Sequence, residues 1–311
     1  MSQQFVIFRG KTGKCFVLDA FCPHLGAHLG TDGKVHEDCI ECPFHGWRFA
    51  GKDGSCVKIP YSKKIPEVAK IKSWETIEQN GYIYLWHHAE GQPPLWKPPV
   101  IPEIENQLML YKGRSEHIVN CHIQDMMKNA ADFGHFSCLH KFGMSSKITL
   151  HPENWWRFFQ LIMKMSCSPV CDETFPCDKY EGIVIFKLFG ISLLQSSFEV
   201  QQIGPAMGYV HTKGLLQNGM IVYNVIPEGP FRQRFIRHYY SFSRFAAIFD
   251  YILFFAEYCM VERDIRIWNY KMYQKNPVYT SEDRTIVKFR KWYSQFYSEN
   301  SPRVEEQYLT W

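Results

Sequence analysis

Two short motifs, each combining one cysteine with one histidine, constrain this chain more than any other feature. They are Cys22-Pro23-His24 and Cys42-Pro43-Phe44-His45, both within the stretch CPHLGAHLGTDGKVHEDCIECPFHGW. Thiolate and imidazole are the ligands that proteins use for zinc and for iron–sulfur clusters. The prolines stiffen the two loops, and the nearby glycines allow the backbone to approach a bound group closely. The stretch therefore predicts a metal or cluster site held between two loops.

The ligand types favour an iron–sulfur cluster over zinc. A structural zinc site usually takes two cysteines from one loop, with C-x2-4-C spacing. In a Rieske [2Fe–2S] centre two histidines replace two cysteines on one iron, so each loop has to give one ligand of each kind. The C-x-H and C-x2-H spacings meet this requirement. We therefore expect Cys22, His24, Cys42 and His45 to bind a Rieske [2Fe–2S] cluster, with a zinc site or plain structural cysteines as the alternatives.

The length of 311 residues allows two domains, and a proline-rich stretch indicates where they meet. Residues 5–21 alternate apolar and polar side chains around Lys11-Thr12-Gly13, which predicts a β-hairpin leading into the first cluster loop. Residues 81–87 predict a further strand, and residues 91–100 (GQPPLWKPPV) are typical of a linker. We expect an all-β Rieske domain over 1–90, the linker over 91–100 and a second domain over 101–311.

The second domain changes in character along its length. Residues 115–140 contain no proline and a single glycine, which predicts a helix. Residues 179–241 contain several β-rich runs separated by Gly-Pro, Asn-Gly and Pro-Glu-Gly-Pro, as in an antiparallel meander. Helix is expected again over 244–275, ahead of Pro277, and over 281–298. Helices packed on a large antiparallel sheet make an α+β domain of the helix-grip type.

Charge and hydropathy exclude several classes of function. The net charge of +4 is too small, and no basic run is long enough, to predict nucleic-acid binding. The longest apolar stretch, residues 245–261, is interrupted by Asp250 and Glu257, which indicates a buried amphipathic helix rather than a membrane span. The 11 cysteines show no disulfide framework and no signal peptide precedes them, so we expect an intracellular, reducing compartment.

A second metal site is predicted within residues 129–140, NAADFGHFSCLH. The pattern D-x2-H-x4-H places Asp132 and His135 three residues apart, on one helical face. His140 lies about 140° further round an ideal helix, so the helix has to bend or unwind for both imidazoles to reach one ion. Two histidines and one carboxylate form the facial triad of non-haem Fe(II) oxygenases, and such an iron could accept the electrons of the cluster.

The carboxylate of this triad has to come from another part of the chain. The candidates are Asp250, Glu257, Glu262 and Asp264, all on the predicted helix 244–275. Their spacing does not choose among them.

Together these features resemble the α-subunit of Rieske non-haem iron oxygenases, and among them most resemble the Neverland-type cholesterol 7-desaturases, which are related to bacterial 3-ketosteroid 9α-hydroxylases. The resemblance implies that Asp264 is the third iron ligand. It also implies that Asp132 orients His135 and bridges to a cluster histidine of a neighbouring subunit in a homotrimer. The similar segments are CPHLGAHLG, CIECPFHGWRF with DGSCVKIPY, QIGP at 202–205, DIRIWNYK at 264–271 and FRKWYSQFY at 289–297.

The resemblance further implies a reaction and its partners. The reaction is the conversion of cholesterol to 7-dehydrocholesterol with O2. The electrons come from NAD(P)H through a reductase and a ferredoxin-type donor, and they leave the cluster through a histidine ligand and Asp132. Association with the membrane of the endoplasmic reticulum is expected from the family.

Two departures from the family pattern lead to further expectations. Family members carry glutamate before the asparagine of the iron-site helix, whereas this chain has Lys128 before Asn129. A cation close to the iron or to the electron path could change the properties of either one. We expect instead that Lys128 points to solvent. The membrane anchor and the opening strand of the family are missing from this sequence, so we expect a shortened form with an unpaired sheet edge. These departures keep open two rivals, a steroid hydroxylase with the same metals and a catalytically inactive sterol-binding or electron-transfer paralogue.

Overall fold

The structure is a computed structural model that describes residues 3–140, 159–168, 175–189, 191–214, 218–242 and 247–301. The chain forms two compact units, Met1–Val100 and Ile101–Trp311.

The first unit consists of small antiparallel sheets. β1 pairs with β2, β3 to β6 form a four-stranded sheet in sequence order, and β7 pairs with β8. The hairpin predicted for residues 5–21 is confirmed as β1 and β2, and the strand predicted for 81–87 is confirmed as β8. The strands are β1 Phe5–Arg9, β2 Cys15–Asp19, β3 Lys34–His36, β4 Cys39–Glu41, β5 Arg48–Ala50, β6 Cys56–Lys58, β7 Thr76–Gln79 and β8 Tyr82–Leu85.

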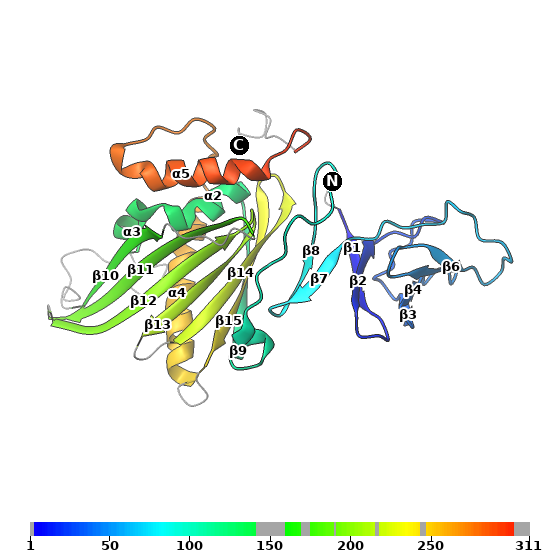
Figure 1. Ribbon diagram of the computed structural model, residues 1–311, viewed down its shortest axis with the longest axis horizontal. Coiled ribbons are helices and arrows are strands. Elements are labelled where there is room, and N and C mark those ends of the chain that lie inside the picture. Colours follow the sequence, from blue (N-terminus) through cyan, green and yellow to red (C-terminus); the bar gives the residue numbers. More distant parts are fainter. Residues whose placement is uncertain are drawn as a thin grey trace. The chain divides into compact units, whose positions relative to one another are not determined.

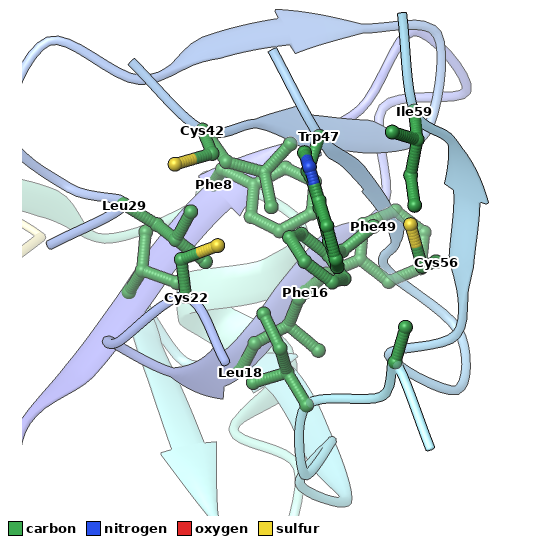
Figure 2. Packing of buried hydrophobic residues seen from close by; sticks show 14 residues of the cluster. Phe8, Phe16, Leu18, Cys22, Leu29, Cys42, Trp47, Phe49, Cys56 and Ile59 are labelled. Carbon is green, nitrogen blue, oxygen red and sulfur yellow. The ribbon is translucent and has the colours of Figure 1, made fainter. Parts of the chain in front are cut away.

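The hydrophobic core of the first unit also holds the two cysteines of the predicted cluster site. Phe16, Leu18 and Phe49 are almost completely buried at its centre, and burial of each such side chain contributes about 1.5–3 kcal/mol. Figure 2 shows Cys22 and Cys42 beside each other at one edge of this core. The positions of both thiols are therefore fixed by the packing of the sheets.

The second unit is organised around a seven-stranded antiparallel sheet in the order β10-β11-β12-β13-β14-β15-β9. The five strands from β11 to β15 follow one another as a meander, which confirms the prediction for residues 179–241 (Figure 1). The strands are β9 Leu110–Val119, β10 Phe159–Ser168, β11 Cys177–Leu188, β12 Ile191–Ile203, β13 Met207–Gly214, β14 Asn218–Gly229 and β15 Arg232–Ser241.

Helices pack on this sheet and complete the predicted α+β class. The long helix α4 lies along one face of the sheet, where Phe254 packs on Tyr239 of β15 with ring centroids 4.6 Å apart (Figure 1). Helix α5 packs on η1, where the Thr285 hydroxyl donates to the Ala131 carbonyl at 2.6 Å. The helices are α1 Pro102–Glu105, α2 Ile123–Met127, the 3-10 helix η1 Lys128–Ala131, α3 Phe133–Leu139, α4 Ala247–Trp268, the 3-10 helix η3 Ser281–Asp283, α5 Arg284–Tyr293 and the 3-10 helix η4 Ser294–Phe296.

Two predictions about these elements need correction, and one strand was missed. The single helix predicted for residues 115–140 is wrong, because residues up to Val119 belong to β9 and only the rest forms the short helices α2, η1 and α3. The strand β10 was not predicted. The helix predicted to reach residue 275 ends at Trp268, well before Pro277. Within the described residues, no helix is both long enough and apolar enough to cross a bilayer.

Candidate iron centres

The two cysteine-containing loops of the first unit have the same backbone construction. The Gly26 amide donates to the Cys22 carbonyl at 2.9 Å, and the Gly46 amide donates to the Cys42 carbonyl at 3.0 Å. Both glycines have a positive φ, +74° for Gly26 and +71° for Gly46, which glycine adopts at little cost. Each loop thus turns back four residues after its cysteine and presents its histidine on the same side as the thiol.

The four predicted ligands of the cluster come together in this unit. The rings of His24 and His45 have centroids 4.7 Å apart, and the thiols of Cys22 and Cys42 interact with each other. Both thiols are buried, and burial raises the pKa of Cys22 to about 11 when no metal is bound. The Nδ1 atom of His24 is buried and finds no hydrogen-bond partner among the described residues. Two buried thiols and two half-buried imidazoles, one with an unused nitrogen, fit a [2Fe–2S] cluster bound by two residues of each kind.

The orientation of His24 is supported by two aromatic residues that the sequence analysis did not single out. The buried Trp47 indole stacks on the His24 ring, with centroids 4.7 Å apart and planes only 7° from parallel. The indole N–H donates to the Tyr61 hydroxyl at 2.8 Å, which holds the indole in place. Trp47 directly follows the second loop, and this position is the only signal in the sequence that could have pointed to it.

In the second unit, His135, His140 and Asp264 meet at one point. One ligand atom of each residue lies within 4.8 Å of the other two. The Asp264 Oδ1 atom is 3.2 Å from the Nε2 atom of His140 and 3.8 Å from that of His135. His140 and Asp264 are buried and His135 is partly buried, so water has limited access to the three donors.

The length of α3 explains how both histidines reach the same point. Asp132 is the N-cap of α3, and its carboxylate accepts from the His135 backbone N–H at 3.3 Å. His140 is the C-cap residue, with φ −97° and ψ 24°, and so lies beyond the regular helix. The predicted unwinding therefore occurs by ending the helix at Leu139. Asp132 precedes the helix instead of sharing a face with His135.

The electrostatics of the second site suit a divalent metal. Burial lowers the pKa of His135, but the hydrogen bond that His135 donates to Asp132 and the charge of Asp264 outweigh this effect, so the net pKa lies above the usual value. The His135 Nδ1 atom is 2.5 Å from the Asp132 carbonyl, which leaves Nε2 for a ligand. That Nε2 atom and the Nδ1 atom of His140 are buried with no hydrogen-bond partner among the described residues. Two imidazoles and one carboxylate form the donor set of a non-haem ferrous site.

The other acidic candidates have different partners. Glu257 forms an ion pair with Arg237 at 2.6 Å, and a carboxylate oxygen of Glu262 lies 3.0 Å from the Nδ1 atom of His117. The side chain of Asp250 lies outside the described part of the chain. Of the four acids considered, Asp264 is thus the one that the fold brings to the two histidines.

A pocket of about 80 Å3 is lined by two of the three donors, His135 and Asp264, and also by Lys128. The expectation that Lys128 points to solvent is wrong. Its side chain is only 16% exposed, and its ammonium group donates to the Asp125 carboxylate at 2.9 Å. The same pocket is lined by Lys271 and by Asn129, whose amide donates to the Asp264 Oδ2 atom at 3.4 Å. Sequence reasoning missed the roles of Asp125 and Lys271, since an acid and a lysine 146 residues apart give no pattern.

Both units match known domain families. Residues 1–74 match the Rieske [2Fe-2S] domain, and residues 85–180 and 254–297 match the 3-ketosteroid 9alpha-hydroxylase C-terminal domain. The fold is similar to that of Pseudomonas putida CBB5 NdmA solved with caffeine, with a TM-score of 0.68 and 15% identity over 94% of this chain and 81% of that one. The match to the Rieske [2Fe-2S] domain confirms the predicted cluster, and the grouping of His135, His140 and Asp264 agrees with the predicted mononuclear iron.

Curated relatives match along nearly the whole chain. A cholesterol 7-desaturase nvd of Xenopus laevis is 39% identical over 318 residues, which cover 100% of this chain and 70% of the relative. Cholesterol 7-desaturase nvd 1 of Ciona intestinalis is 40% identical over 311 residues, which cover 98% of this chain and 65% of the relative. The chain thus spans about two-thirds of the length of these relatives. It belongs to the cholesterol 7-desaturase (nvd) family of Rieske-type oxygenases.

Proposed function

We propose that this chain is a sterol desaturase that converts cholesterol to 7-dehydrocholesterol with O2 and electrons from a ferredoxin-type donor. The observation that carries the proposal is the 39% identity to a cholesterol 7-desaturase, in an alignment that covers the whole chain and therefore spans both iron centres. The donor would be reduced by NAD(P)H through a reductase, as expected for this family.

The residues of the second unit would perform three tasks in this reaction. His135, His140 and Asp264 would hold the ferrous ion, and the clustering of their ligand atoms within 4.8 Å supports this role. Asn129 would keep the Asp264 carboxylate in its orientation through the hydrogen bond to Oδ2. Burial of the three donors would limit the access of water. When bound, the iron supplies the site of O2 activation, and the cluster supplies single electrons.

Asp132 would act at the boundary between two copies of the chain. Its side chain is 32% exposed, and its backbone carbonyl and carboxylate already hold His135. We propose that the exposed part of the carboxylate contacts a cluster-binding histidine of a second copy in a homotrimer. The oligomeric state of the purified protein, measured by light scattering, tests this arrangement.

Membrane association at the endoplasmic reticulum is also a proposal. Its support is the chemistry of the substrate, because cholesterol is an apolar lipid that resides in bilayers. Flotation of the expressed protein with vesicles that contain cholesterol tests this proposal directly.

Turnover by the purified, iron-loaded protein tests the reaction. Cholesterol, a ferredoxin, its reductase and NADPH should yield 7-dehydrocholesterol, identified by its conjugated-diene absorption and its mass. The variant His135→Ala should lose turnover while the visible spectrum of the Rieske cluster is retained. Unchanged turnover in this variant would exclude the site assignment.

A steroid hydroxylase is the second candidate, since the second unit matches the 3-ketosteroid 9alpha-hydroxylase C-terminal domain. A hydroxysterol as the only product would favour it. A catalytically inactive sterol-binding or electron-transfer paralogue would show neither product, and iron content separates it, since a cluster-only protein holds about two irons per chain and an oxygenase about three.

A further inference from the structure

A cluster of three charged side chains lies in the pocket beside the iron-binding residues. Asp125, Lys128 and Lys271 all line this pocket together with His135 and Asp264. The ammonium groups of Lys128 and Lys271 both donate to the same oxygen, Oδ1 of Asp125, at 2.9 and 3.0 Å. The three residues come from different elements, since Asp125 lies on α2, Lys128 on η1, and Lys271 follows α4. The fold thus assembles them at the site.

Stability alone does not account for this arrangement. The Asp125 side chain is only 7% exposed, and burial of an ion costs several kcal/mol, about as much as a buried ion pair returns. The second oxygen of Asp125, Oδ2, is buried without a hydrogen-bond partner among the described residues. Asp125 balances only one of the two ammonium groups that it binds, and the other carboxylates lining the pocket belong to Asp132 and Asp264. The two ammonium groups repel each other across the oxygen atom that they share.

The reaction of the proposed function has a requirement that the cluster can meet. Desaturation removes two hydrogen atoms from the sterol and reduces one O2 to two H2O. The balance is closed by two electrons from the donor protein and two protons from solvent. These protons have to reach the iron-binding residues, of which His140 and Asp264 are buried.

We propose that Lys128 supplies these protons to the pocket and that Lys271, acting across Asp125, restores the proton that Lys128 gives up. This inference rests on the proposed function. In each step an N–H bond of Lys128 breaks, its proton is relayed by water in the pocket to an oxygen atom of the O2 that is being reduced to H2O, and the ammonium becomes a neutral amine. The amine then takes a proton from Lys271 by way of the shared Oδ1 atom. Lys271 in turn is reprotonated by solvent.

The exposure of the side chains fits this direction of transfer. Lys271 is 28% exposed, so it contacts solvent, whereas Lys128 is 16% exposed and lines the pocket. The pocket of about 80 Å3 has room for several water molecules between Lys128 and the iron-binding side chains. Burial lowers the pKa of Lys271, the Asp125 carboxylate offsets part of this effect, and the nearby Lys128 adds to it. Lys271 therefore releases a proton more readily than an ordinary lysine.

The other titratable groups around the cluster are poorly suited to the same task. Burial raises the pKa of the Cys121 thiol to about 12, so it remains protonated. Burial lowers the pKa of His122, which is therefore neutral, and its Nδ1 atom accepts a hydrogen bond from the backbone N–H of Gln124. Asp132 faces the pocket as an ionised carboxylate, because its interaction with His135 outweighs burial and lowers its pKa. Arg290 acts on His122 from α5 but stays charged at any working pH.

The variant Lys128→Arg separates proton donation from charge. Arginine keeps the positive charge and the contact with Asp125, but it does not release a proton. The exposed Lys275→Arg is the matched control. We expect Lys128→Arg and Lys128→Met to lower the rate of sterol desaturation about 100-fold, which is the usual scale of general acid catalysis. Both variants should also form hydrogen peroxide in place of the desaturated sterol. Lys275→Arg should behave as the wild type. A wild-type rate and wild-type coupling of O2 to product in Lys128→Arg would overturn the proposal.

Two further measurements distinguish this proposal from a structural role of Lys128. The variant Lys128→Ala should be rescued by added methylammonium in proportion to its concentration, and the wild type should consume O2 more slowly in deuterium oxide. Absence of rescue in a variant with full iron content and an intact Rieske spectrum, or absence of the isotope effect, would refute proton supply by Lys128. A wild-type protein that makes no desaturated sterol would instead refute the proposed function.

Discussion

The ion pair between Arg237 and Glu257 is expected to decide whether α4 stays in place on the sheet. Arg237 lies on β15, is 1% exposed, and donates from Nη1 to both carboxylate oxygens of Glu257 on α4 at 2.6 Å. Its Nε atom donates to the Ser115 hydroxyl of β9 at 3.0 Å, so one guanidinium joins two strands and the helix. The substitution Arg237→Met keeps an unbranched apolar stem and removes all three contacts.

The expected loss of stability follows from the burial of the partners. Removal of one member of a buried ion pair costs about 3–5 kcal/mol, because the other charge stays uncompensated. Glu257 is 26% exposed and keeps the hydrogen bond from the Tyr239 hydroxyl at 3.1 Å, so the cost should lie at the lower end. About 3 kcal/mol in a unit of this size lowers the melting temperature by about 6–12 °C.

Thermal unfolding followed by far-ultraviolet circular dichroism measures this change. The matched control is Arg232→Met on the same strand, whose side chain is 57% exposed in its contact with Glu228 and which should melt with the wild type. The double variant Arg237→Met, Glu257→Leu should regain most of the stability, because no buried charge is left unpaired. If Arg237→Met melted with the wild type, the guanidinium would not hold α4 and the argument would fail.

Three more predictions concern the iron centres and pH. Gly46→Ala should lower the cluster content, measured by visible absorption, more than Gly26→Ala does. Both substitutions place alanine in the left-handed backbone region at a cost of about 1–2 kcal/mol. Only at residue 46 would the new Cβ atom also lie too close to a neighbour, 2.9 Å from Pro60 Cγ. His140→Ala should lose the mononuclear iron in iron analysis while the visible cluster spectrum persists, and loss of both would contradict separate sites. Burial raises the pKa of Asp125, but the charges of Lys128 and Lys271 outweigh burial, so the net pKa is lowered. The contribution of Asp125 to stability should therefore be present at neutral pH and vanish as the pH falls below about 4. Asp125→Asn should flatten the acid side of the plot of stability against pH, and a plot as steep as that of the wild type would refute this prediction.

The sequence predicted those parts of the protein in which local pattern and chemistry agree. The cluster loops are continuous in sequence, and both close within five residues, so ligand type and spacing were sufficient to propose the site. The helix predicted over 115–119 failed for a physical reason. The side of β9 that faces α4 carries Ser115 and His117, which join Arg237 and Glu262, so the polar contacts hide the alternation of a strand.

Long-range pairing explains the other failures. Nothing near Lys128 in the sequence shows that α2 buries its polar residues, so a lysine there was expected in solvent. The partner Lys271 follows the C-terminal end of α4, and only the fold brings it to Asp125. The choice of Asp264 as the third donor likewise needed the resemblance, because the position of α4 on the sheet decides which of its acids reaches α3.

The geometry of the second centre therefore depends on contacts remote from it. Glu257 and Asp264 are both on α4 and lie seven residues apart, two turns of helix, so the contact of Arg237 with the first fixes the axial position of the second. Glu262 lies between these two residues on α4, and its Oε1 atom is 3.0 Å from the Nδ1 atom of His117 on β9. This contact resists rotation of the helix about its axis. Translation of α4 along its axis and rotation about its axis would both move Asp264 away from His140. The contacts of Glu257 and Glu262 oppose these two motions and add to the apolar packing of Phe254 on Tyr239.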